Sequence, residues 1–143
     1  GGSAVMEDCI MPRLYREAPI NAIWEGSGNV QCLDVLRAIT KTPKSLEALS
    51  AELHAAEGRN PDYDKRLACI SQALKSVDDF EQQGRWLVEN LALLFQGSVL
   101  IQAGNETVSD MFCATRLRDN NAQMFGAIPK GFNLAQYIQR AAL

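Results

Sequence analysis

The apolar side chains between residues 63 and 98 recur every three or four positions, which is the period of one face of an α-helix. A pattern of this length predicts either one helix of about 40 residues, on the order of 60 Å long, or two helices that break near Gly84. The positions that carry the pattern are Tyr63, Leu67, Ile70, Leu74, Val77, Gly84, Val88, Leu91, Phe95 and Ser98.

Two further helices are predicted before this pattern. Residues 30–39 place Val, Leu, Leu and Ile at three-residue steps, so they form one apolar face that ends before Pro43. The next helix carries its leucines between residues 46 and 53, and either Thr42 or Ser45 can cap it.

Asparagine residues mark the start of the other helices. Asn60 followed by Pro61 is a typical helix start, with a side-chain oxygen at the cap and proline in the first turn. The long pattern ends at Gly104, after which Asn105 can cap another helix, and Asn133 can cap a last short one.

The fold class predicted from these segments is all-α, an antiparallel helical bundle, because no alternating strand pattern occurs in the sequence. Residues 119–130 are expected to form a loop with a corner at Phe125 and Gly126. Apolar stripes that such a bundle leaves exposed favour self-association, so we expect a homo-oligomer. The chain begins with Gly1 and not with methionine, which we interpret as a processed or excised piece of a longer protein.

Charge and cysteine content limit the classes of function. A net charge of −3 gives no general attraction to nucleic acid or anionic membrane. We expect no membrane span, because no apolar run is long enough to cross a bilayer. We also expect no secretory signal, because no basic start is followed by an apolar stretch. The four cysteines are widely spaced, so we expect reduced, buried thiols in a cytoplasmic protein. The single histidine, His54, lacks neighbours at ligand spacing, so no metal site is predicted.

The segment with the clearest chemical content is the turn at residues 24–27, Trp-Glu-Gly-Ser. The apolar residues Ile23 and Trp24 would partly desolvate the Glu25 carboxylate, which suits a general base. Gly26 allows close backbone approach, and the start of the next helix together with Ser27 favours an anion such as a phosphate. The alternative is an ordinary glycine-containing helix start with a solvated Glu25.

Three motifs in the first 37 residues resemble the C-terminal flavin-site segment of the acyl-CoA dehydrogenases. They are GGSAV at residues 1–5, LYREA at 14–18 and IWEGS at 23–27, in the family's order and with its spacing. The sequences around these motifs, MPRLYREAP and WEGSGNV, are similar to the AidB branch of the family, which is associated with the adaptive response to alkylation damage. The resemblance implies an end of the dehydrogenase C-terminal domain over residues 1–40 and an extra helical domain over residues 41–143.

The resemblance also implies the chemistry. Glu25 matches the base that removes the α-proton of an acyl-CoA thioester, and its backbone amide would bind the thioester carbonyl. Gly26, Ser27 and Asn29 match positions near the FAD cofactor. Gly1 and Gly2 match a glycine pair that approaches the cofactor of a neighbouring subunit.

The sequence departs from the family pattern at three positions. Ala4 and Val5 replace the glycine and the aromatic residue of the first motif, which weakens the implied cofactor contact there. Cys32 stands where the family often has arginine. The domains that hold most of the flavin and acyl-CoA contacts are not in the sequence, so the chain alone should not complete a catalytic cycle.

The alternative function is a non-catalytic helical module for oligomerisation or for DNA binding and protection, as in the alkylation response. DNA is a partner that the AidB branch implies, and the pairs Lys65–Arg66 and Arg116–Arg118 could form local basic patches. Eleven basic residues face twelve acidic ones between positions 40 and 143, however. Since counterion release needs clustered cations, the sequence favours the enzymatic interpretation.

Overall fold

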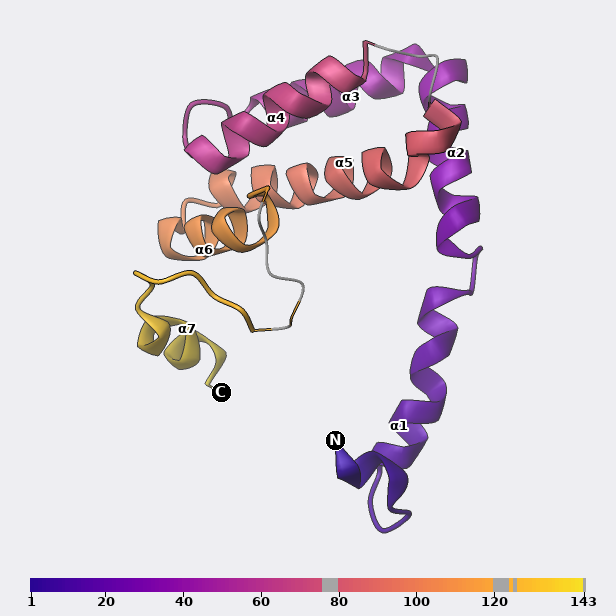
Figure 1. The fold of residues 1–143 in the computed structure, drawn as a ribbon, viewed down its shortest axis with the longest axis vertical. Coiled ribbons are helices and arrows are strands. Elements are labelled where there is room, and N and C mark those ends of the chain that lie inside the picture. Colours follow the sequence, from indigo (N-terminus) through magenta and orange to yellow (C-terminus); the bar gives the residue numbers. More distant parts are fainter. Residues whose placement is uncertain (76–79, 120–123, 125, 143) are drawn as a thin grey trace.

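The computed structural model describes residues 1–75, 80–119, 124 and 126–142, and within them the chain forms helices and no strand (Figure 1). The predicted all-α fold class is confirmed. The elements in chain order are η1 (Gly2–Val5), α1 (Met11–Glu17), η2 (Ala18–Ala22), α2 (Gly28–Lys41), α3 (Pro43–His54), α4 (Pro61–Ala73), α5 (Phe80–Gln102), α6 (Glu106–Arg116) and α7 (Leu134–Ala141), where η marks a 3₁₀ helix.

Helix α5 lies at the centre of the bundle and packs against α2, α3, α4 and α6. Figure 1 shows α3 and α4 on the same side of α5, with α6 near its C-terminal end and α2 crossing near its start. The core is formed by the side chains Leu36, Leu53, Ala56, Tyr63, Leu67, Ile70, Leu87, Leu91, Leu94, Ile101, Cys113 and Leu117.

Residues 1–27 form an arm that leads away from this core (Figure 1). Helix α1 packs on η1 and η2, and its apolar side chains, such as Leu14 and Tyr15, remain exposed. The apolar face predicted for residues 30–39 is only half used, because Leu36 is buried and Ile39 partly buried, whereas Val30 and Leu33 are exposed. The arm therefore presents a large apolar surface.

The long apolar pattern is divided between two helices, and the break was not predicted correctly. Helix α4 ends at Ala73 and α5 begins at Phe80, so the break precedes Gly84; Val77 lies outside the described residues. Gly84 is buried within α5, where a Cβ atom would lie 2.9 Å from Leu36 Cδ1. This glycine therefore allows the close crossing of α2 and α5 and does not end a helix.

The predicted asparagine caps are confirmed. The side chain of Asn60 accepts hydrogen bonds from the backbone N–H groups of residues 62 and 63, and Asn105 and Asn133 cap α6 and α7 in the same way. Thr42 is the cap residue of α3, but its side chain makes no capping hydrogen bond. At the corner predicted at residues 125 and 126, Gly126 has a φ of +81°, and Phe125 lies outside the described residues.

The expectation of buried thiols holds for only one of the four cysteines. Cys113 is buried in the core, Cys32 is half-buried, and Cys9 and Cys69 are exposed; all four are free thiols. Cys69 is exposed because the partner helices of α4 cover only the face that carries Tyr63, Leu67 and Ile70. Burial raises the pKa of the Cys113 thiol to about 12.

Candidate functional site

The predicted site is built on a tight turn between η2 and α2. Glu25 has a φ of +62°, which is the left-handed region that non-glycine residues rarely adopt, and Gly26 follows with a φ of +115°. The N–H of Gly26 donates to the carbonyl of Ile23 at 3.2 Å. A left-handed non-glycine residue costs about 1–2 kcal/mol, so other contacts must hold Glu25 in this conformation.

One such contact comes from Gln31, a residue that the sequence analysis did not single out. Its side-chain Nε2 donates to the backbone carbonyl of Glu25 at 2.8 Å. Gln31 lies in the first turn of α2, and its own N–H donates to the carbonyl of Ser27 at 3.1 Å. The side chain of Gln31 therefore joins the first turn of α2 to the Glu25 turn and stabilises the strained residue.

The carboxylate of Glu25 faces solvent in this chain. The expected desolvation by Ile23 and Trp24 is not present, because both side chains and Glu25 are exposed. Among the described residues, the backbone N–H of Glu25 makes no backbone hydrogen bond outside the helices, so it is available as a donor.

The predicted cofactor residues Gly26, Ser27 and Asn29 are brought together with Glu25 around the start of α2. Ser27 is the N-cap residue with extended backbone, and its hydroxyl makes no capping hydrogen bond. Gly28 has open space where a Cβ would be. The Oδ1 of Asn29 accepts a hydrogen bond from Arg85 Nε of α5 at 3.1 Å, a contact that spans 56 residues of sequence.

Gly1 and Gly2 are not part of this cluster. They lie at the start of η1, next to the N-terminus, which Figure 1 places at the end of the arm opposite to the start of α2. Apart from their chain neighbours, no described atom would lie within 4 Å of a Cβ at either position. Both glycines are exposed.

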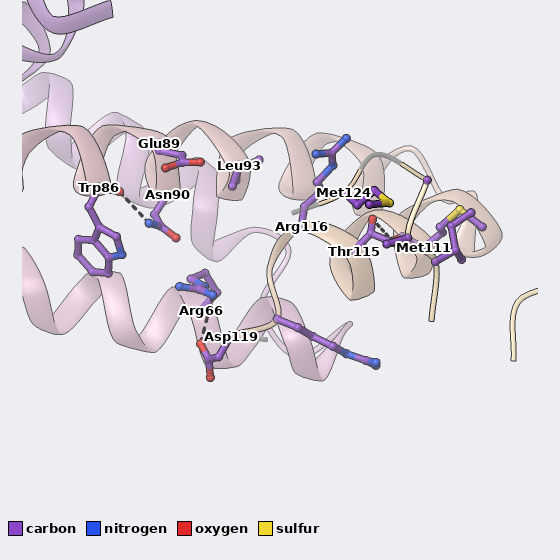
Figure 2. Close-up of a pocket in the computed structure, with 14 residues that line it drawn as sticks. Arg66, Trp86, Glu89, Asn90, Leu93, Met111, Thr115, Arg116, Asp119 and Met124 are labelled. Atoms are coloured by element: carbon purple, nitrogen blue, oxygen red, sulfur yellow. Dashed lines mark hydrogen bonds and ion pairs between the residues drawn. The ribbon is translucent and has the colours of Figure 1, made fainter. Parts of the chain in front are cut away.

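A cavity of about 790 Å³ lies elsewhere, between α4, α5 and α6 (Figure 2). Its lining combines the indole of Trp86, the buried amide of Asn90 and the exposed side chain of Met124. Figure 2 shows Arg66 beside Asp119 on one side of it and Arg116 on the other. No residue of the Glu25 turn lines this cavity.

The basic residues around the cavity are largely neutralised by acids. Lys65 and Arg66 both pair with Asp119, and Arg118 binds Asp62 through both carboxylate oxygens at 2.8 and 2.9 Å. The hydrogen bond and the charge of Lys65 lower the pKa of Asp119. For Arg116 no ion pair is found within the described part of the chain.

Two classes of site are absent from residues 1–75, 80–119, 124 and 126–142. No three His, Cys, Asp or Glu side chains gather there as metal ligands. None of the helices in these ranges is long and apolar enough to cross a bilayer.

Comparison with known proteins places the turn in a recognised segment. The family model described as "Acyl-CoA dehydrogenase, C-terminal domain" matches residues 1–40. The chain is 34% identical over 117 residues to "Putative acyl-CoA dehydrogenase AidB" of Escherichia coli (strain K12), which is 82% of the chain and 21% of that protein. It is 32% identical over 103 residues to "Acyl-CoA dehydrogenase family member 11" of Caenorhabditis elegans, 72% of the chain and 16% of that protein. The chain thus spans about a fifth of the length of these relatives.

Proposed function

Because the chain belongs to the acyl-CoA dehydrogenase family and is similar to the C-terminal portion of its AidB-like members, we propose that it supplies the general base of a dehydrogenase for acyl-CoA thioesters. The observation that carries this proposal is the left-handed Glu25, held by Gln31 inside the segment that matches the family. Strained residues of this kind cluster at functional sites, where the surrounding structure holds them in place.

In the proposed reaction the Glu25 carboxylate removes the proton at the α-carbon of the thioester. The free N–H of Glu25 donates to the thioester carbonyl and stabilises the negative charge that develops on its oxygen. The left-handed turn supports this reaction because it leaves the N–H of Glu25 without a helical acceptor. The donor and the carboxylate then belong to the same residue and can act on the same thioester. The desolvation that a base needs must come from residues outside this chain, because the turn is exposed here.

The residues after Glu25 fit a flavin dinucleotide. The hydroxyl of Ser27 and the amide of Asn29 are polar groups at the start of α2, and Gly28 adds no side chain that would crowd a ligand. FAD, when bound, would accept the hydride from the β-carbon. Gly26, Ser27 and Asn29 are proposed to contact it from the same subunit, and Gly1 and Gly2 from a neighbouring subunit of a homo-oligomer.

The test uses the full-length protein that contains this chain, purified with its flavin and kept without oxygen. Adding straight and branched acyl-CoA thioesters should bleach the visible flavin absorbance of the wild type. Glu25→Gln keeps the size of the side chain but cannot take a proton, so it should lower the bleaching rate by at least 10²-fold. Glu47→Gln on α3 is the matched control and should react like the wild type. A wild type that binds FAD but never bleaches would refute the proposed reaction.

A further inference from the structure

We propose that Arg85 of α5 is a positioning residue for the flavin site, acting through Asn29. This inference rests on the proposed function, in which Asn29 contacts FAD. The inference goes beyond the proposed function because Arg85 lies outside residues 1–40, the part that the family model matches. The geometry thereby links the helical extension to the cofactor site.

The position of Arg85 follows from the crossing of α2 and α5. Buried Gly84 lets α5 approach Leu36 of α2 so closely that a Cβ at residue 84 would meet Leu36 Cδ1 at 2.9 Å. Arg85 is the next residue on α5, and from there its Nε reaches Asn29 Oδ1 at 3.1 Å. Figure 1 shows the same arrangement, with α2 crossing near the start of α5.

This hydrogen bond decides which end of the Asn29 amide remains available. The guanidinium of Arg85 is only a donor, so it can bind the oxygen of the amide and not the NH₂ group. Among the described residues, Asn29 Nδ2 has no hydrogen-bond acceptor. Arg85 therefore fixes Asn29 as a hydrogen-bond donor at the start of α2, matched to an acceptor atom of FAD such as a phosphate oxygen, a ribose hydroxyl or a ring nitrogen.

The experiment measures the FAD affinity of the full-length apoprotein by the quenching of flavin fluorescence. Arg85→Ala leaves Asn29 free to rotate and should weaken FAD binding about 2- to 10-fold, the range expected for one hydrogen bond. Arg85→Lys can still donate to the same oxygen and should recover most of this loss. Arg59→Ala removes an exposed arginine that precedes α4 and should leave the affinity unchanged.

A double-mutant cycle separates an action through Asn29 from a general weakening of the fold. If Arg85 acts through Asn29, the double variant Arg85→Ala with Asn29→Ala should bind FAD no more weakly than Asn29→Ala alone. If the losses of FAD affinity in the two single variants multiply in the double variant, the inference is overturned and the proposed function stays intact. An Arg85→Ala variant with wild-type FAD affinity would have the same meaning. An apoprotein that binds no FAD at all would overturn both.

Discussion

The side-chain amide of Gln31 donates a hydrogen bond to the backbone carbonyl of Glu25, with 2.8 Å between Nε2 and the oxygen. The accepting carbonyl belongs to a residue with a φ of +62°, so the hydrogen bond stabilises a conformation that the glutamate would otherwise rarely adopt. Because the carboxylate and the free N–H of Glu25 turn with its backbone, Gln31 controls the direction of both groups.

Gln31→Ala should therefore impair thioester oxidation more than thioester binding. Small displacements of a catalytic group can cost up to about 10²-fold in rate, so we expect kcat to fall by about 10- to 100-fold with a smaller change in KM. Steady-state kinetics with an artificial electron acceptor measure both constants. Gln96→Ala on the exposed side of α5 is the matched control. Equal changes in kcat for the two variants would contradict this role of Gln31.

Tyr63→Phe should destabilise the bundle. The buried hydroxyl of Tyr63 donates to the carbonyl of Leu53 at 2.7 Å, near the C-terminal end of α3. The same carbonyl also accepts the N–H of Ala56 at 3.4 Å, so removal of the hydroxyl should lower the free energy of unfolding by about 0.5–1.5 kcal/mol, the net value of one hydrogen bond. Urea denaturation followed by circular dichroism measures the loss. Tyr15→Phe on exposed α1 should cost almost nothing, and a similar loss in both variants would show that the buried hydrogen bond is not the cause.

The stability of the chain should fall in alkaline solution. Burial is the main cause that raises the pKa of Cys113 from 9.0 to about 12 and that of Tyr63 from 10.0 to about 12. The unfolded chain loses these protons at lower pH than the folded one, so their contribution is complete below about pH 9 and is lost as pH rises toward 12. We expect a loss on the order of a few kcal/mol.

Denaturation curves measured between pH 8 and about pH 11 test this dependence. Cys113→Ala removes one of the two groups, so its stability should fall less steeply between about pH 9 and pH 10. Cys69→Ala removes an exposed thiol and should follow the wild type. A wild-type curve that stays flat across this range would contradict the predicted effect of burial.

DNA binding should be limited by the acids that pair with the basic residues near the cavity. The variant Asp62→Asn with Asp119→Asn frees the exposed cations Lys65 and Arg118 from their ion pairs, whereas Arg66 stays bound to the carbonyl of Leu117. We expect at least about a 10-fold gain in affinity for duplex DNA and a steeper decline with salt, because more phosphates can be neutralised. Fluorescence anisotropy of a labelled duplex at several salt concentrations measures both.

The control for this experiment is Glu17→Gln with Asp34→Asn, which breaks the exposed ion pairs with Arg13 and Arg37. It removes the same number of negative charges away from the cavity, so its effect should be smaller. Tight, salt-sensitive binding by the wild type would instead favour the alternative function as a DNA-binding module.

Local sequence signals predicted the elements that depend on a few neighbouring residues. The caps at Asn60, Asn105 and Asn133 each bind N–H groups two or three positions away, so they form whenever the helix forms. The turn at Glu25 and Gly26 is also local, because the N–H of Gly26 donates to the carbonyl of Ile23 three positions before it. The break between α4 and α5 was misplaced because glycine is a weak signal within a helix, and here Gly84 serves the packing of α2.

Sequence patterns alone predict a set of amphipathic helices and the Glu25 turn that resembles the acyl-CoA dehydrogenases. The folded structure is needed to see which apolar faces are covered, which cations are neutralised and that Arg85 reaches Asn29. These features differ from the helices and the turn in their sequence separation. Contacts between residues more than 50 positions apart depend on how helices cross, and the crossing is set by the packing of many side chains together and not by any short pattern.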